Sequence, residues 1–304
     1  MHLLSGSTDG IRRWRVPDGQ EVGNRMGMEI KAISVSRDNR WIVCGTTKGA
    51  SVWDGEMREK AIEVESIETV VAVDISPDST RFATCTGVSD NKATIWDILT
   101  GERLVGPLLH LGEITGVAFS PTGEQIATAG GQHQCIRIFD SRNGDQLITI
   151  GSLIEPPYEY SPSSSVAWSK DGKQIFAQSY YISQIMIFDT STGSLLAKTL
   201  SQKNDVHDFV SITLAANGKF FAVSAEPCIS FLDASTLTQI GPVGIEDTEN
   251  AKSIALSPDC SYLATGSIFG SITIRNLSDI LPESYGPFHV SIHAFTVLAC
   301  RFTP

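Results

Sequence analysis

Short apolar stretches alternate with polar turns along the whole chain, and this pattern predicts strands rather than helices. In one stretch, strand-forming residues occupy positions 70–75, 82–85, 93–96 and 103–105, with polar turn residues between them. β-branched and aromatic side chains dominate these segments, as is typical of short strands joined by tight turns. The sequence therefore predicts a unit of four strands.

This unit recurs seven times along the chain. A Ser-Pro-Asp-like turn between the first two strands begins at Ser36, Ser76, Ser120, Ser169, Ala215, Ser257 and Thr303. An aromatic–acidic pair, eroded toward the C-terminus, ends the third strand at Trp14, Trp53-Asp54, Trp96-Asp97, Phe139-Asp140, Phe188-Asp189, Leu232-Asp233 and Arg275-Asn276. Gly19, Gly101, Gly144 and Gly193 all fall in the turn that follows this pair, where we expect positive φ angles. The pattern indicates a repeat architecture.

The turn and the Trp-Asp pair resemble the WD40 repeat, in which each copy forms one four-stranded blade of a β-propeller. The resemblance implies an all-β fold, a seven-bladed WD40 β-propeller, as a single domain over residues 1–304. We expect blade one from residues 2–24 together with 293–304, and blades two to seven at about 29–64, 69–106, 113–150, 162–200, 208–243 and 250–288. The sequence of residues 12–16 is similar to that of WD40 proteins from mushroom-forming fungi.

The two ends of the chain are expected to share one blade. No inner strand precedes the strand that starts at His2, whereas residues 297–302 match the inner strand at residues 116–119. We therefore expect the C-terminal strand to complete the N-terminal blade and to close the propeller. Closure of this kind removes free sheet edges that would otherwise aggregate.

Charge, cysteine content and the lack of long apolar runs indicate the class of partner, the state of the thiols and the location of the protein. The formal net charge is −11, which disfavours nucleic acid and anionic membranes, because neither would meet a basic surface. The six cysteines are scattered and form no C-x-x-C pair, which indicates reduced thiols. The sequence shows no long apolar run and no signal-like N-terminus. We expect a soluble, monomeric, cytoplasmic protein, with a nuclear location still open.

The resemblance also implies a buried hydrogen-bond network between a His before the inner strand, an Asp in the second hairpin turn, and the Trp. His293, Asp9 and Trp14 supply all three residue types in the closing blade. A solvated His293 is the alternative. Blade four offers His110 but has Phe139 in place of Trp, so we expect a smaller contribution to stability from His110.

Motifs for catalysis, nucleotide binding or metal binding are not found in the sequence. We therefore expect no catalytic residue, no metal and no cofactor. The repeated acids Asp38, Asp78, Asp171 and Asp259 occupy one turn position in different copies, so we interpret them as turn residues. A propeller enzyme such as a lactonase or another hydrolase, with a site in the central channel, is an alternative. The inner strands disfavour it, because they are apolar at Ile33, Val73, Val117, Val166, Ile212 and Ile254.

A partner is expected on the loop face, which we define as the end of the blades formed by the loops before each inner strand and the turns between the second and third strands. Partners of this family commonly use this face, and loops on a rigid frame usually carry recognition. The candidate partner-binding residues are Glu29, Lys31, Glu113, Tyr158, Tyr160, Tyr180, Tyr181, Asp208, Glu246, Asp247, Glu249 and Lys252. Acidic side chains would attract a Lys/Arg-rich segment of a partner, and tyrosines are typical anchor residues of protein interfaces. Alternatively, the tyrosines cover blade five and the acids only improve solubility.

These observations favour a non-catalytic scaffold that recognises a protein or peptide. The loop face would present acids and tyrosines to a basic segment of the partner. An obligate structural subunit of a larger complex is equally compatible with the sequence.

Overall fold

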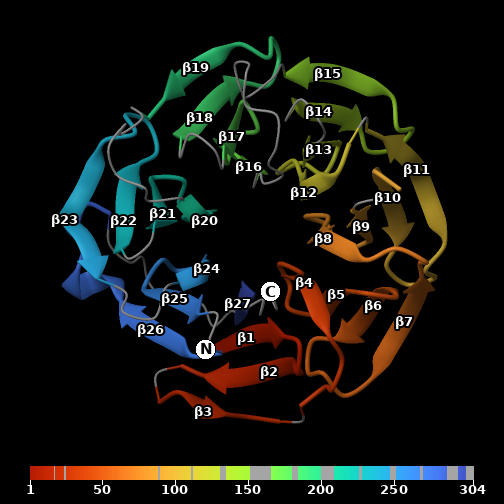
Figure 1. Ribbon diagram of the computed structural model, residues 1–304, viewed down its shortest axis with the longest axis horizontal. Helices are drawn as coiled ribbons and strands as arrows, with labels where there is room; N and C mark the ends of the chain where they lie inside the picture. The colour runs from red at the N-terminus through yellow and green to blue at the C-terminus, as the bar shows by residue number, and fades with distance from the viewer. Residues whose placement is uncertain are drawn as a thin grey trace. The chain divides into compact units, whose positions relative to one another are not determined.

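The fold is all-β, and its described strands form seven sheets (Figure 1). The computed structural model describes residues 1–16, 18–23, 25–87, 90–110, 112–130, 135–150, 166–179, 184–199, 209–225, 228–246, 251–267, 270–285 and 294–298. This arrangement confirms the predicted seven-bladed β-propeller. We number the blades in chain order and the strands of each blade from first to fourth.

Blades one to four each contain four strands, and their bounds are as follows. Blade one has β27 (Ala294–Leu298), β1 (His2–Ser7), β2 (Gly10–Arg15) and β3 (Gln20–Glu21), and blade two has β4 (Ile30–Val35), β5 (Trp41–Thr46), β6 (Gly49–Asp54) and β7 (Lys60–Glu65). Blade three has β8 (Val70–Ile75), β9 (Arg81–Thr86), β10 (Lys92–Asp97) and β11 (Arg103–Leu109), and blade four has β12 (Ile114–Phe119), β13 (Gln125–Gly130), β14 (Cys135–Asp140) and β15 (Gln146–Ile150).

Blades five and six are also four-stranded, whereas three strands of blade seven are described. Blade five has β16 (Val166–Trp168), β17 (Gln174–Ser179), β18 (Gln184–Asp189) and β19 (Leu195–Lys198), and blade six has β20 (Phe209–Leu214), β21 (Phe220–Ala225), β22 (Cys228–Asp233) and β23 (Gln239–Glu246). Blade seven has β24 (Ala251–Leu256), β25 (Tyr262–Ser267) and β26 (Ile272–Asn276), followed by a short 3₁₀ helix, η1 (Leu277–Asp279). The helix departs from the purely strand-and-turn sequence prediction.

The turn between the first and second strands is stabilised by its own side chains. In blade three, the Ser76 hydroxyl donates to Asp78 Oδ1 at 2.6 Å and accepts the Arg81 N–H at 2.9 Å. The same Ser–Asp pair occurs at Ser36–Asp38, Ser169–Asp171 and Ser257–Asp259. These bonds confirm that the repeated aspartates are turn residues, and side chains of this kind commonly close tight turns.

The turn between the third and fourth strands needs a residue in the left-handed region. Gly19, Gly101, Gly144 and Gly193 have φ angles of 67°, 70°, 80° and 72°, which confirms the sequence prediction. Blades two and six place Met57 and Leu237 there instead, with φ angles of 59° and 56°. Because left-handed conformations cost a side-chain-bearing residue energy, these two turns are held by their surroundings.

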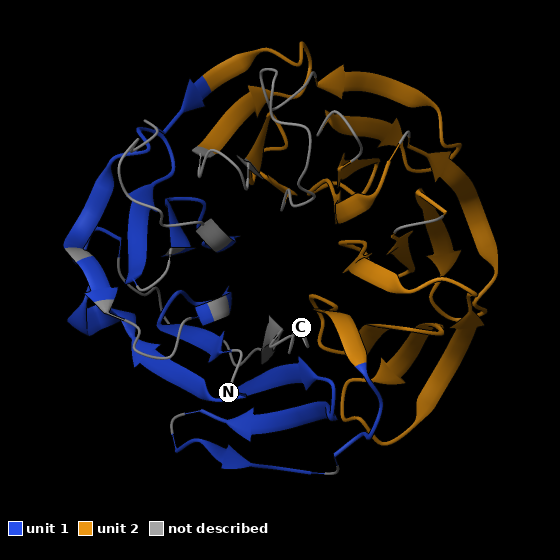
Figure 2. Ribbon diagram, in the orientation of Figure 1, with its two compact units in different colours: residues 1–29, 182–184, 197–304 blue, residues 30–181, 185–196 orange. Residues whose placement is uncertain are grey.

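Contact clustering divides the chain into two compact units (Figure 2). One unit contains residues 1–29, 182–184 and 197–304, and the other contains residues 30–181 and 185–196. In the second unit, apolar clusters lie between successive sheets. Phe82 packs with Val43 and Val52 of blade two, whereas its neighbour Ala83 packs with Ile126 of blade four. Successive side chains of a strand point to opposite faces, so both faces of a blade are buried.

The first unit is built in the same way. A cluster between blades six and seven includes Phe220, Phe231, Ile254 and Leu263, together with Leu281 from the segment after η1. Leu3 of blade one packs with residues of blade seven in another cluster. Burial between adjacent sheets therefore supplies the core of each unit.

The C-terminal strand completes the first sheet, as the sequence predicts, but its direction differs from that of the strand at residues 116–119, to which the sequence matched it. β27 ends at Leu298 and pairs with β1 in parallel, from His2 opposite Ala294 to Gly6 opposite Leu298. In blade four, by contrast, β12 pairs with β13 in antiparallel. Residues 299–304 lie outside the described residues.

Truncation tests the contribution of β27. Removing residues 294–304 should lower the melting temperature by about 10 °C, because β1 would lose its partner and losing a strand costs several kcal/mol. Thermal unfolding followed by circular dichroism measures this change. The control removes only residues 299–304, which leaves β27 in place and should cost less. Equal losses in both truncations would contradict the observed position of β27.

Candidate functional site

The structure describes part of the predicted loop face. Glu113, half-buried just before β12, lies beside Gly87 of blade three, with its Oε1 3.2 Å from the position of a Cβ added at Gly87. Glu29 and Lys31 are half-buried at the start of β4. Glu246 ends β23 and Lys252 lies in β24. The other candidate positions, Tyr158, Tyr160, Tyr180, Tyr181, Asp208, Asp247 and Glu249, fall outside the described residues. The role of the four tyrosines in partner binding thus stays a prediction.

Further acids lie near this face on β7 of blade two and in the loop before β8. Glu63 and Glu65 are exposed on β7, and Glu68 follows before β8. Lys60 forms an ion pair with Glu63. Within the second unit, the described acids near this face are thus two glutamates on β7 and one in each of the loops before β8 and β12.

Two members of the predicted network in blade one have other partners. The exposed Asp9 carboxylate forms an ion pair with Arg25, with Nη2 3.1 Å from Oδ2. The Trp14 indole N–H donates to the Ser5 hydroxyl at 2.8 Å. His293 lies outside the described residues, so its proposed link to these side chains stays a prediction.

A hydroxyl on the second strand, which the sequence analysis did not single out, receives a donor from the third strand in several blades. The Trp96 indole donates to Thr84 at 2.9 Å. In blade seven an arginine replaces the indole, and Arg275 Nη1 donates to Thr265 at 3.1 Å. The signal in the sequence is a Ser or Thr at the fourth position of the second strand, as at Ser5, Thr84 and Thr265. Blade two has Cys44 there, and its Trp53 indole donates to Ser51 of its own strand, β6, at 3.0 Å.

Blade four satisfies the equivalent hydroxyl with its histidine. The buried His110 ring shares a 2.6 Å hydrogen bond between Nε2 and the Thr128 hydroxyl and lies 6.2 Å from the ring of Phe139. Burial, assisted by the positive charge of Arg137, lowers the pKa of His110 to about 4. A neutral, enclosed imidazole of this kind holds the loop before β12 against β13 and is poorly placed for acid–base chemistry at neutral pH.

A half-buried carboxylate links the first strands of three blades. Asp74 on β8 accepts the Phe119 N–H of blade four at 2.8 Å through Oδ2, and the Ser34 hydroxyl of blade two at 3.5 Å through Oδ1. Desolvation raises the pKa of Asp74 to about 6, although these bonds and the charge of Arg37 oppose the rise. The side chain is committed to joining strands.

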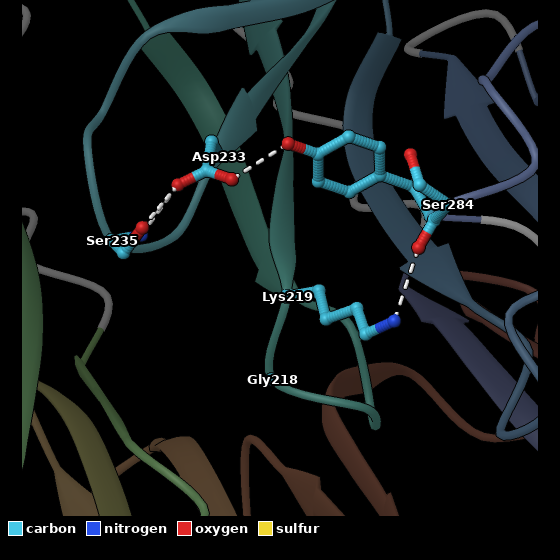
Figure 3. A pocket seen from close by; sticks show the side chains of 6 residues that line it. Gly218, Lys219, Asp233, Ser235 and Ser284 are labelled. Atoms are coloured by element: carbon cyan, nitrogen blue, oxygen red, sulfur yellow. Dashed lines mark hydrogen bonds between the residues drawn. The ribbon is translucent and has the colours of Figure 1, made fainter.

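A cavity of about 410 Å³ lies between blades six and seven, at the opposite end of the strands from the loop face (Figure 3). Lys219 Nζ donates to the Ser284 carbonyl at 3.0 Å, and the Tyr285 hydroxyl donates to Asp233 Oδ2 at 2.7 Å. Asp233 also accepts the Ser235 hydroxyl at 2.6 Å, and this bond is the main cause of its lowered pKa. These bonds fasten the segment after η1 to blade six.

Metal and thiol chemistry gain no support from the part of the chain that the structure describes. Its residues contain no group of three His, Cys, Asp or Glu side chains that could hold a metal ion. Cys44 and Cys85 are buried free thiols, and burial raises the pKa of each above its usual value. Buried thiols of raised pKa are unreactive. The described helices include none long and apolar enough to cross a membrane.

Asp74→Asn should remove a pH dependence of stability. The folded-state pKa of Asp74 is raised, so its protonation favours the folded state at low pH and this gain is lost between about pH 4 and 6. The variant should therefore gain roughly 1–3 kcal/mol relative to wild type as the pH rises from 4.5 to 7. Denaturant unfolding at both pH values measures this difference.

Asp171→Asn is the matched control. A hydroxyl bond from Ser169 lowers the pKa of Asp171, so this variant should show no gain at pH 7. An Asp74→Asn variant whose stability follows the wild type at both pH values would refute the account of Asp74.

Comparisons with known proteins agree with the fold. The family model described as WD domain, G-beta repeat matches residues 65–97 and 105–140. The β-propeller domain of Cps50 (Swd1) from Myceliophteria thermophila matches with a TM-score of 0.74 and 16% sequence identity, over 90% of this chain and 93% of that chain. At this identity the match supports the fold alone.

Two curated relatives show how far the sequence similarity extends. The guanine nucleotide-binding protein subunit beta of Arabidopsis thaliana is 27% identical over 61% of this chain, and the chain spans 48% of that protein. Eukaryotic translation initiation factor 3 subunit I of Scheffersomyces stipitis is 23% identical over 86% of this chain and 73% of that protein. Together with the seven sheets, these matches show that the chain contains WD40 repeats at residues 65–97 and 105–140 and has the fold of a seven-bladed β-propeller.

Proposed function

We propose that this protein is a non-catalytic scaffold whose loop face recognises a basic segment of a partner protein. The observation that carries the proposal is the set of glutamates on β7 and on the loops before β8 and β12, which are Glu63, Glu65, Glu68 and Glu113. Like charges held on rigid loops attract a Lys/Arg-rich segment and speed its association. The tyrosines of blade five would add anchoring area to the same face.

The relatives support the broader part of this proposal. Two of them are named as subunits, the guanine nucleotide-binding protein subunit beta and the translation initiation factor 3 subunit I. A WD40 propeller that takes part in an assembly is a protein-interaction scaffold. We extend this role to the present chain, together with a cytoplasmic location and a monomeric propeller.

The described side chains favour recognition over catalysis. Val73, Val117 and Ile254 keep the first strands of their blades apolar, as predicted. His110 and Asp74, two titratable groups with shifted pKa values, are both engaged in hydrogen bonds between strands. The alternative of a hydrolase would need such groups to face a substrate.

Charge reversal on the loop face tests the function. A partner identified by cross-linking to the full chain is first measured for affinity and association rate at two salt concentrations. Reversing Glu246, Asp247 and Glu249 to Lys should slow association about tenfold and reduce its salt dependence, because rim charges act mainly on the on-rate. Replacing Tyr158, Tyr160, Tyr180 or Tyr181 by Ala should cost about 2 kcal/mol or more at the anchoring position.

Glu59→Lys with Glu102→Lys is the control, because both glutamates are exposed in turns at the opposite end of the strands. This control should bind as the wild type does. Affinity that is independent of salt and unchanged in every loop-face variant would contradict the proposed function.

A further inference from the structure

Ile67 is the most exposed large apolar side chain of the loop face among the described residues. It lies in the loop between β7 and β8 and is 97% exposed. Leu109, which is 61% exposed, lies at the end of β11, where the chain turns toward β12. Both belong to the same compact unit, and both lie on consecutive loops of the same face. An apolar side chain exposed to this degree gains free energy when a partner removes it from water.

The backbone that carries Ile67 is held firmly. The Ser66 N–H donates to the Lys48 carbonyl at 2.9 Å, and the Glu68 N–H donates to the Ser66 hydroxyl at 3.1 Å. Ser66 also lies close to Gly49, where an added Cβ would be 2.8 Å from the Ser66 nitrogen. Ile67 is therefore displayed on an ordered turn, and its backbone would lose little freedom when a partner binds.

Leu109 is displayed in a similar way. Its carbonyl accepts Arg137 Nη1 at 2.7 Å, and the next N–H, that of His110, donates to the Asn91 carbonyl at 2.9 Å. The buried His110 ring, bonded to Thr128, fixes the chain directly after it. The backbone hydrogen bond of His110 corresponds to that of Ser66, so the two aliphatic side chains flank equivalent positions in successive loops.

Glutamates lie near Ile67 in the sequence, and one follows Leu109 in the loop before β12. Glu65 and Glu68 lie within two residues of Ile67, and Glu113 lies four residues after Leu109, beside Gly87 and Val71. An aliphatic group among acids complements a segment that carries both apolar and basic side chains. A segment with basic side chains alone would leave Ile67 and Leu109 exposed to water.

We propose that Ile67 and Leu109 are apolar anchors of the loop face, and that the partner segment places aliphatic or aromatic side chains on them between its lysines and arginines. This inference rests on the proposed function and adds a requirement for apolar residues in the partner. Burying an exposed aliphatic side chain stabilises a complex in proportion to the area removed from water. The glutamates speed the association of the basic segment, and burial of the two aliphatic side chains slows its dissociation.

A displayed library of random 12-residue peptides, selected on the full-length wild-type protein, tests this inference. The enriched peptides should combine Lys or Arg with Leu, Ile or Phe. A synthetic copy of an enriched peptide should bind Ile67→Ser and Leu109→Ser about tenfold more weakly than wild type, which corresponds to about 1.4 kcal/mol. Leu99→Ser is the matched control, because Leu99 is 66% exposed in the turn between β10 and β11, away from the loop face. Its affinity should not change.

The outcomes separate this inference from the function on which it rests. Wild-type affinity in both Ser variants, with weaker binding by Glu113→Lys, would refute the anchoring role of Ile67 and Leu109. The proposed recognition by acidic residues of the loop face would then still hold. Enriched peptides without an excess of Lys or Arg, and with unchanged affinity for Glu113→Lys, would overturn the proposed function and this inference together. Circular dichroism of each variant confirms that the protein remains folded.

Discussion

Apolar packing between successive sheets is the interaction on which the rest of the structure depends. A four-stranded sheet with apolar side chains on both faces cannot bury either face alone, so each blade requires a neighbour on each side. Blade three shows the requirement directly, since Phe82 packs toward blade two and Ala83 toward blade four. The alternation of side chains along β9 thus ties the stability of one blade to the two beside it.

Polar groups within this frame are arranged to serve the packing. The Trp96 indole donates to Thr84, Arg275 donates to Thr265, and His110 shares a hydrogen bond with Thr128, so a buried hydroxyl has a side-chain partner in each of these blades although the partner differs. Asp74 meets the same need across blades by accepting the Phe119 N–H. Buried polar groups are costly unless they are paired, which explains why these side chains are committed to structure. The exposed side chains of the loops are not needed for this pairing, so they can contact a partner protein.

Local chemistry made much of the fold predictable from the sequence. The strand at residues 70–75 and the glycine turn at Gly101 follow from strand propensity and from the need for a left-handed residue, both of which act over a few residues. The role of Asp74 could not be predicted in this way, because Ser34 and Phe119 come near it only in the folded protein. The parallel pairing of β27 with β1 and the fastening of Tyr285 to Asp233 are long-range features of the same kind. For the candidate site, sequence reasoning predicted an acidic loop face, which stays a prediction, whereas the exposure of Ile67 is a property of the folded chain that the sequence did not indicate.

Hydrogen exchange by mass spectrometry on wild type and Phe82→Ala tests the central claim about packing. Removing the fully buried Phe82 ring should cost about 3–5 kcal/mol. The account predicts faster exchange not only in β9 but also in β5 of blade two and β13 of blade four, because the three sheets support one another. Faster exchange confined to β9, with β5 and β13 unchanged, would show that the blades are stable independently and would contradict the account.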